Sequence, residues 1–223
     1  MEVRLVHIRD GYNRVAKEYA EKFFHELDGK PKDRELLQRF SKLVSGKGPV
    51  CDLGCGPGEV AYYLNQIGTP EVFGIDLAPD MITLARQLNP GLEFRSNDYG
   101  ALPDAENSWA GIAAFYSIVH VPRADVIHIL REWKRVLKPG GMLLLSFHIG
   151  NEIIHPEEFL GQKVNIDWIC FEVAEMVQYL IEAGFLVLDV IERAPYVEVE
   201  HPTNRGYIFA GKPVEEEQQL ILM

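Results

Sequence analysis

The sequence predicts an α/β protein in which helices cover both faces of a doubly wound, mostly parallel sheet. Strand-like and helix-like segments alternate from residue 50 onward, residues 142–147 form an apolar run typical of a strand buried on both faces, and a glycine-rich turn follows the first strand. The expected strands are residues 50–53, 72–75, 92–95, 110–116 and 142–147. The helices expected between them are residues 59–66, 79–88 and 123–137.

A helical segment precedes this alternation. Between residues 12 and 27, apolar side chains recur at steps of three and four residues, which is the period of one helical face. Gly29 and Pro31 are expected to end that helix, and a second short helix is expected over residues 36–44. Residues 1–45 are therefore assigned to an N-terminal helical lid and residues 48–148 to the core.

The late part of the chain is expected to finish the sheet. Residues 149–172 are less regular and are assigned to a cap, while residues 173–212 contain an expected helix at 171–183 and expected strands at 186–191 and 207–210. Residues 213–223 form a tail with no assigned function. Because one core can hold a chain of 223 residues, a single domain is predicted.

Net charge, the N-terminal sequence and cysteine content limit which binding partners, location and metal sites we expect. The chain has 22 Lys+Arg against 33 Asp+Glu, a net charge of −11, and this field repels nucleic acid and anionic lipid. The N-terminus lacks an apolar run long enough for a signal peptide or a membrane span, so a cytoplasmic location is expected. Cys51, Cys55 and Cys170 are odd in number without CxxC spacing, which favours reduced thiols and predicts no metal site.

The most specific signal is Asp52-Leu-Gly-Cys-Gly-Pro-Gly at the turn from a buried strand into a helix. Gly54, Gly56 and Gly58 let the backbone bend sharply and approach a ligand. A phosphate cradle usually adds a lysine, whereas this loop has Asp52 before it and Glu59 after it. Carboxylates suit the sulfonium and ammonium of S-adenosylmethionine, and the backbone N–H groups suit its carboxylate.

Two further acidic positions follow the next strands. Asp76 ends the second strand, where a carboxylate can accept hydrogen bonds from both hydroxyls of a ribose, or can instead serve as the N-cap of the helix near Pro79. After the third strand, Asn97-Asp98 offers an acceptor for an adenine amine, and Tyr99 can cover the ring. The alternative for these three residues is a solvated turn.

The glycine turn and three further segments occur in the order found in one known family. Asp52-Leu-Gly-Cys-Gly-Pro-Gly, Gly74-Ile-Asp76-Leu, Asn97-Asp98-Tyr99 and Leu137-Lys-Pro-Gly-Gly-Met-Leu resemble, over residues 48–148, the motifs of the class I S-adenosylmethionine-dependent methyltransferases of the small-molecule type. The resemblance implies a Rossmann-like sheet of seven strands, the last antiparallel. Lys138-Pro-Gly-Gly is expected to be a turn into the fifth strand.

The same resemblance implies a cofactor site. The glycines would line the methionine portion, Asp76 would hold the ribose, Asp98 the adenine, and Leu77 and Met81 would pack against the base. Tyr12 and Tyr19 resemble lid-helix tyrosines that reach the cofactor carboxylate, although a purely packed amphipathic helix explains them nearly as well. The cofactor-binding residues predicted in full are Tyr12, Tyr19, Asp52, Gly54, Cys55, Gly56, Gly58, Asp76, Leu77, Met81, Asn97, Asp98, Tyr99 and Tyr116.

The methyl acceptor is expected beyond the carboxyl ends of the strands, beside residues 115–120 and 147–148. Methyl transfer is an in-line displacement that orientation in a water-poor pocket can accelerate without a dedicated base. Where a proton must leave, His120 or His148 is the candidate catalytic base. The alternatives are a helix-entry residue for His120 and a satisfied strand-end side chain for His148.

Two later segments are candidates for the wall of the acceptor pocket. Phe159 and Trp168 lie in the cap segment and would favour an apolar or planar acceptor. Residues 197–201, with Thr203 and Arg205, alternate polar and apolar side chains as a half-exposed strand does, and they could border the same opening.

Motif absences favour a small-molecule acceptor. The Asn/Asp-Pro-Pro-Tyr sequence of amino-directed nucleic-acid methyltransferases and the Pro-Cys pair of the cytosine-directed class are both missing. An NAD-dependent oxidoreductase is a weaker alternative, because its GxGxxG fingerprint would need the third glycine elsewhere. A non-catalytic S-adenosylmethionine-binding protein on the same scaffold also stays open. No sequence feature specifies an oligomeric state.

Overall fold

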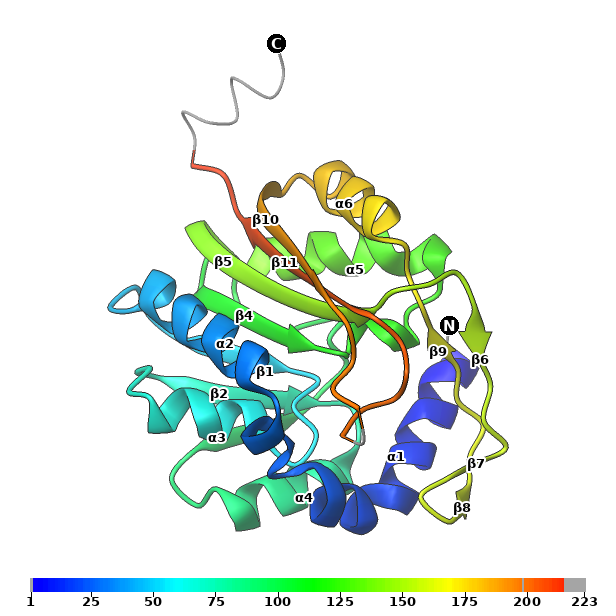
Figure 1. Ribbon diagram of the computed structural model, residues 1–223. Helices are drawn as coiled ribbons and strands as arrows, with labels where there is room; N and C mark the ends of the chain where they lie inside the picture. Colours follow the sequence, from blue (N-terminus) through cyan, green and yellow to red (C-terminus); the bar gives the residue numbers. More distant parts are fainter. Residues whose placement is uncertain (1, 198, 215–223) are drawn as a thin grey trace.

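The computed structural model describes residues 2–197 and 199–214, so most of the tail assigned to residues 213–223 lies outside the described residues. A central twisted sheet separates two layers of helices, and a further helix with short strands lies across one end of the sheet (Figure 1). None of the helices within the described ranges is long and apolar enough to cross a membrane.

The sheet has seven strands in the order β10-β11-β5-β4-β1-β2-β3. Their bounds, in chain order, are β1 (Val50–Leu53), β2 (Val72–Asp76), β3 (Glu93–Ser96), β4 (Trp109–Phe115), β5 (Leu137–His148), β10 (Leu186–Arg193) and β11 (Arg205–Gly211). β11 runs antiparallel to both of its neighbours, and the pairs from β5 to β3 are parallel. The predicted fold class, including an antiparallel last strand, is confirmed.

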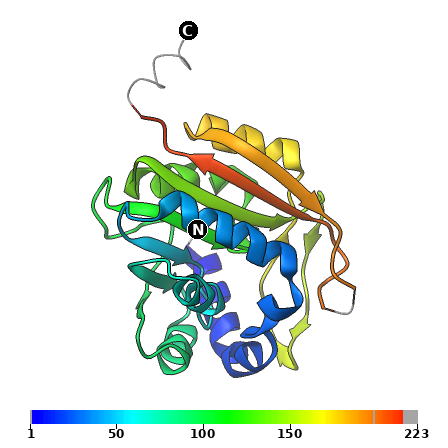
Figure 2. The same ribbon diagram turned by 60° about the vertical axis from the view of Figure 1, so that its left-hand side comes forward.

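Helices cover both faces of this sheet. The bounds are α1 (Glu2–Phe23), η1 (Glu26–Gly29), α2 (Pro31–Val44), α3 (Glu59–Gln66), α4 (Pro79–Leu88), η2 (Ile118–His120), α5 (Arg123–Val136) and α6 (Val173–Glu182). Apolar side chains of α2, α3 and α4 form one buried cluster with the sheet, and those of α5 and α6 form another. Figures 1 and 2 show α2 on one face, with α5 and α6 on the other. Burial of these two apolar layers is the main driving force for folding.

The N-terminal helices differ from the expected boundaries. α1 begins at Glu2, and it ends at Phe23. Pro31 does not end a helix but begins α2, because the first helical turn needs no N–H from proline. Gly11 lies inside α1, where a Cβ would come within 3.0 Å of Ile166 Cγ2, so the glycine lets the cap pack closely on the helix.

β5 also begins earlier than expected. The register passes from the pair Trp109 and Leu137 directly to the pair Gly111 and Met142. The Lys138-Pro-Gly-Gly segment therefore bulges out of the ladder at the start of β5, with Gly140 at φ +72°. The expected turn before the fifth strand is therefore wrong, because these residues belong to β5 itself.

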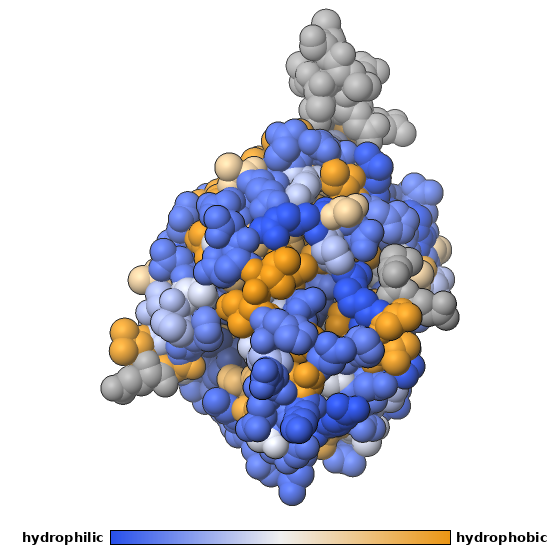
Figure 3. All heavy atoms as spheres, turned by 90° about the vertical axis from the view of Figure 1, so that its right-hand side faces the viewer, coloured by the Kyte–Doolittle hydropathy of each residue, from blue (hydrophilic) through white to orange (hydrophobic). Residues whose placement is uncertain are grey.

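The carboxyl ends of the parallel strands lie under α1 and residues 149–172. This segment holds the short strands β6 (Ile153–Ile154), β7 (Glu158–Phe159), β8 (Gln162–Lys163) and β9 (Trp168–Ile169), in which β6 pairs with β9 and β7 with β8. Its Val164 and Ile166 pack with Ile8 and Val15 of α1 and with Met81 of α4. The face carrying these elements is mainly polar, with apolar side chains gathered near its centre (Figure 3).

The turn from β1 into α3 yields a prediction about stability. Gly58 has φ +90°, and a Cβ there would lie 2.8 Å from Asn89 Nδ2 and from Phe94 Cζ. Gly68, just after α3, has φ +85°, and a Cβ there would meet no heavy atom within 4 Å in the described part of the chain. Gly58→Ala is expected to lower the free energy of unfolding by about 2–4 kcal/mol, and Gly68→Ala by about 1–2 kcal/mol.

Chemical denaturation followed by tryptophan fluorescence measures both losses. Because the two glycines share a left-handed backbone, the difference between the variants isolates the contact with Phe94 and Asn89. Equal losses would show that this close packing is unimportant.

Candidate active site

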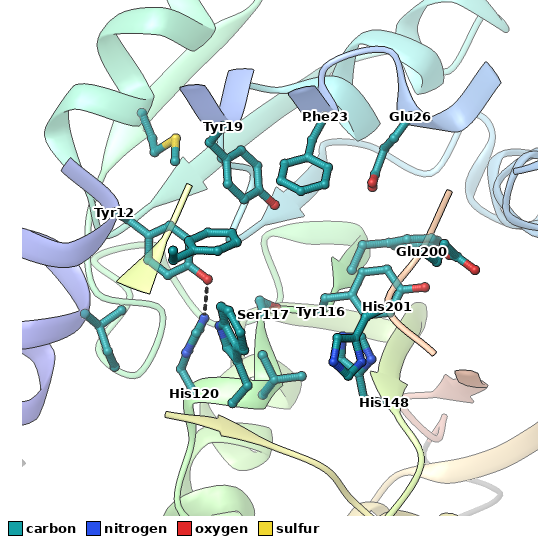
Figure 4. Close-up of a pocket in the computed structure, with 18 of the residues that line it drawn as sticks. Tyr12, Tyr19, Phe23, Glu26, Tyr116, Ser117, His120, His148, Glu200 and His201 are labelled. Carbon is teal, nitrogen blue, oxygen red and sulfur yellow. Dashed lines mark hydrogen bonds between the residues drawn. The ribbon is translucent and has the colours of Figure 1, made fainter. Parts of the chain in front are cut away.

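A cavity of about 630 Å³ opens at the carboxyl ends of β1, β2, β4 and β5. Its walls come from α1, the glycine turn, the strand ends, the cap and the loop between β10 and β11 (Figure 4). The sequence-predicted site residues that line it are Tyr12, Tyr19, Gly54, Gly56, Asp76, Leu77, Met81, Tyr99, Tyr116, His120 and His148.

The glycine turn after β1 forms the floor of the cavity. The N–H groups of Gly54 and Cys55 both donate to the carbonyl of Ile75, at 2.8 and 2.9 Å, which ties the turn to the end of β2. Gly54 has φ +77°, and a Cβ there would lie 2.4 Å from Ser117 Cβ. Only glycine therefore lets the ends of β1 and β4 approach so closely.

Three predicted binding residues lie behind this floor. Asp52 is buried, and its Oδ2 accepts a hydrogen bond of 2.9 Å from the Ala61 N–H, so it fixes the start of α3. Burial is the main reason why the pKa of Asp52 is raised to about 7. The Cys55 sulfur packs against the backbone of Gly74, and Gly58 packs against Phe94. Their roles in cofactor binding stay predictions.

Asp76 connects the glycine turn after β1 with the loop that follows β2. Its Oδ2 accepts a hydrogen bond of 2.9 Å from the Gly56 N–H, and its Oδ1 accepts one of 2.8 Å from the Ala78 N–H. Each oxygen keeps further acceptor capacity, so a diol at the cavity could still bind. The alternative that Asp76 is the N-cap of the following helix is wrong, because Ala78 occupies that position in α4. Burial raises the pKa of Asp76, while these backbone bonds partly oppose the shift.

A buried oxygen beside the floor has no hydrogen-bond partner among the described residues, and it indicates whether a cationic cofactor fits the cavity. Glu59 Oε2 is buried without a hydrogen-bond partner among the described residues, 3.9 Å from where a Cβ on Gly56 would lie. Burial and the nearby carboxylate of Glu26 raise the pKa of Glu59 well above its usual value. A ligand ammonium group would relieve this unpaired carboxylate. The floor therefore fits S-adenosylmethionine, as the acidic residues around the glycines suggest.

Tyr12 and His120 close one side of the cavity. Tyr12 Oη lies 2.8 Å from His120 Nε2, and His120 Nδ1 lies 2.9 Å from the carbonyl oxygen of Asp167. Because that carbonyl can only accept, Nδ1 carries the hydrogen and Nε2 accepts from the tyrosine hydroxyl. Burial lowers the pKa of His120 to about 4, so this ring is neutral and weakly basic. Figure 4 shows the bond between Tyr12 and His120, and the bond to Asp167 extends this link from α1 and η2 to the cap.

Tyr116 and His148 form the opposite side. Tyr116 has φ +54°, a left-handed conformation that is rare for a bulky residue and is often found at functional sites. Its ring centroid lies 5.1 Å from that of His148. The Tyr116 hydroxyl lies 3.2 Å from that of Tyr207, and His148 Nδ1 lies 2.7 Å from Thr203 Oγ1. Burial, followed by the charge of Arg205, lowers the pKa of His148 to about 3.

Of the three predicted adenine contacts, only Tyr99 lines the main cavity. Asp98 Oδ1 accepts a hydrogen bond of 2.8 Å from the Gly100 N–H, and Asn97 Nδ2 donates to the carbonyl of Ala101 at 3.1 Å. Asp98 borders a smaller pocket of about 120 Å³, and Tyr99 lines both pockets. The structure thus brings Tyr99 to the main cavity, while binding by Asn97 and Asp98 stays a prediction.

Several lining residues were missed or only partly signalled by the sequence. Residues 199–201 form a turn and loop rather than the expected half-exposed strand, yet they do border the cavity, while Glu198 lies outside the described residues. Glu200 in this loop accepts hydrogen bonds from Arg193 and from the Tyr196 N–H, which fix its side chain without strand pairing. The polar residues that were missed include Lys22, Glu26 and Lys30, which come from the end of α1 and from the segment before α2, and Glu158 from the cap.

Comparison with known proteins agrees with this geometry. A family model described as "Methyltransferase domain" matches residues 50–141. The demethylmenaquinone methyltransferase of Chlorobaculum parvum is 32% identical over 92 residues, which are 41% of this chain and 37% of that protein. The chain spans less than half the length of the first curated relatives that it matches.

Solved structures show the same fold over nearly the whole chain. The DhpI–SAH complex has a TM-score of 0.73 and 20% identity, covering 94% of this chain and 97% of that one. The magnesium protoporphyrin IX methyltransferase ChlM of Synechocystis PCC 6803 with bound SAM has a TM-score of 0.69 and 16% identity, with coverage of 94% and 97%. The family match spans the strands that carry the glycine turn and Asp76, so residues 50–141 are similar to a methyltransferase domain, and the chain has the Rossmann-like fold of these solved methyltransferase structures.

Proposed function

We propose that this protein transfers a methyl group from S-adenosylmethionine to a small-molecule acceptor bound beyond the ends of β4 and β5. One observation carries the proposal: a single cavity of about 630 Å³ contains both the glycine floor and the wall of Tyr116 and His148. That volume falls in the range of about 300–1,000 Å³ typical of small-molecule sites. Donor and acceptor would therefore share one chamber.

The covering of the cavity favours a small acceptor over a polymer. α1 lies on one side and the cap on another, with Phe159 and Trp168 in the lining. The ring centroids of these two residues lie 5.0 Å apart, and such aromatic surface suits an apolar or planar molecule. The net charge of −11 adds a repulsive field toward nucleic acid.

Orientation is the main contribution that the chain's residues would make. The bound cofactor supplies a methyl carbon that is already activated by the sulfonium. Gly54 and Asp76 would fix its position at the floor, while Tyr116 and His148 would hold the acceptor in line. The Tyr12–His120 bond would keep the cover closed against water. The proposed base role of His120 requires displacement of Tyr12, because its Nε2 already accepts a hydrogen bond.

A labelled-transfer assay tests the proposal. Purified protein is incubated with methyl-labelled S-adenosylmethionine and a metabolite extract, and the label is expected in a low-mass product. The control is the Asp76→Asn variant at the same concentration, which should transfer much less label. Tight cofactor binding with no label in any small molecule would contradict the proposed transfer.

Cofactor affinity provides a second prediction. Asp76→Asn is expected to weaken S-adenosylmethionine binding by about 2–3 kcal/mol, since a charged acceptor of two hydroxyl hydrogen bonds is lost. Asp80→Asn, on an exposed residue in the first turn of α4, is the control and should leave the affinity unchanged. Isothermal titration measures both, and equal affinities in the two variants would remove Asp76 from the cofactor site.

The pH dependence of turnover provides a third prediction. The pKa values of His120 and His148 are lowered to about 4 and about 3, so both rings are already neutral at pH 6. We therefore expect neither ring to add a step to the pH profile of kcat between about pH 6 and 8, because neither gains or loses a proton in that window, whereas Asp52, with a pKa raised to about 7, titrates there. A steady-state profile measures this. A rise centred near pH 6.5 that disappears in His148→Gln would contradict the expectation.

A further inference from the structure

The acceptor end of the cavity contains a buried arginine in an unusual position. Arg205 begins β11 and pairs in register with His148 at the end of β5. It is only 2% exposed, yet it lines the cavity. Its guanidinium carbon lies 5.6 Å from the centroid of the Tyr116 ring, on the wall assigned to the acceptor. A cation is therefore built into this end of the site.

Arg205 donates hydrogen bonds only to neutral oxygens within the described part of the chain. Its Nη1 donates to the carbonyl and hydroxyl oxygens of Thr203, and its Nη2 donates to the carbonyl of His201 at 3.0 Å. Its Nε is buried with no hydrogen-bond partner among the described residues. The nearest carboxylate oxygen, Oε1 of Glu200, is 3.8 Å away, which is beyond hydrogen-bond distance.

The carboxylates nearby already have other partners. Glu200 accepts two hydrogen bonds from Arg193, at 2.6 and 2.8 Å, and its Oε1 lies 3.3 Å from Lys30. Glu26 pairs with Lys30 at 2.8 Å. Asp33 pairs with Arg193 at 2.7 Å and accepts a hydrogen bond from Tyr207.

These pairings leave the Arg205 guanidinium without a hydrogen-bonded anion. In formal charge the cluster is balanced, since Glu26, Asp33 and Glu200 face Lys30, Arg193 and Arg205. The hydrogen-bonding groups of the carboxylates are nevertheless taken up by Lys30 and Arg193. A buried guanidinium in this state gains stability from an added carboxylate that accepts from it.

The electrostatic environment of His148 agrees with this picture. After burial, the causes that lower its pKa are the charges of Arg205, His201 and Lys30, in that order of size. The opposing influence of Glu200 is smaller than any of them. The cations near the His148 ring therefore affect its pKa more than Glu200 does.

From the buried Arg205, whose Nε has no hydrogen-bond partner among the described residues, we infer that the acceptor carries a carboxylate, that Arg205 binds it beside His148, and that one carboxylate oxygen receives the methyl group. The inference rests on the proposed methyl transfer and names its substrate class. A single guanidinium whose one ion-pair partner, Glu200, lies 3.8 Å away without a hydrogen bond matches one added negative charge, which favours a carboxylate over a doubly charged oxyacid. Phe159 and Trp168 would contact the apolar body of the acid.

The bond changes balance without a base. A carboxylate lone pair forms the new carbon–oxygen bond while the carbon–sulfur bond breaks, and sulfur keeps that electron pair. No proton leaves, so weakly basic histidines suffice. A positive and a negative charge are lost together, which is favoured where the effective dielectric constant is low.

Ligand binding tests the recognition step without a known substrate. Benzoate and its neutral isostere benzamide are titrated into the complex with S-adenosylhomocysteine, using the fluorescence of the cavity residue Trp168. Benzoate is expected to bind about tenfold more tightly than benzamide, as for a charge-assisted contact. In Arg205→Gln the preference should vanish, whereas the exposed control Arg39→Gln should retain it. Equal binding of the two probes to the unaltered protein would overturn the inference.

Product chemistry separates this inference from the proposed function. The label from an acid-containing extract should be released as volatile methanol by alkali, because methyl esters hydrolyse and methyl ethers and amines do not. Label in an alkali-stable small molecule would overturn the carboxylate inference while leaving methyl transfer intact. Absence of label from all small molecules would contradict the proposed function itself. Thermal melting and cofactor titration of Arg205→Gln show whether the variant is folded; if it is not, the benzoate–benzamide comparison on the unaltered protein decides.

Discussion

The contact between the glycine turn and the second strand is the constraint on which the site depends. Two N–H groups of the turn donate to Ile75, and Gly56 donates to Asp76, so the loop after β1 is fixed to the end of β2. The loop can take this path because Gly54 leaves room for Ser117 from the neighbouring β4. Three strand ends thereby meet within reach of one ligand, at the point where the strand order reverses.

α1 and the cap, which lie over these strand ends, are held in place by polar as well as apolar contacts. Met81, Val15 and Ile166 pack α1 between α4 and the cap. Tyr12, His120 and the carbonyl of Asp167 then form a chain of hydrogen bonds across the edge of the cavity. Since His120 stays neutral, this link persists through the physiological pH range.

The cavity is polarised along its length. Carboxylates of Asp76 and Glu59 lie near the floor, and burial raises both of their pKa values, an effect that Lys30 partly opposes at Glu59. Arg205 and Lys30 lie at the other end, beside Tyr116. Such an arrangement favours a cationic donor at one end and an anionic acceptor at the other, because opposite charges in a low dielectric attract strongly. The network around Glu200 keeps the arginine in place without neutralising it by hydrogen bonds.

Local signals let the sequence alone predict much of the core. α3 and α4 begin and end at the expected residues, and Asp76 lies at the expected strand tip, because glycine turns and apolar periods act over short stretches of chain. The start of α1 and the role of Pro31 differed, since apolar contacts with the cap extend the helix and proline is tolerated in a first turn.

Only the tertiary structure decided which distant residues meet. Tyr12 and His120 are 108 positions apart, and the pairing of Arg205 with His148 depends on the antiparallel insertion of β11 beside β5. The depressed pKa values of the histidines likewise arise from burial, which no local pattern encodes. The sequence thus determined the scaffold and the glycine floor, whereas long-range packing and desolvation created the wall of Tyr116 and His148.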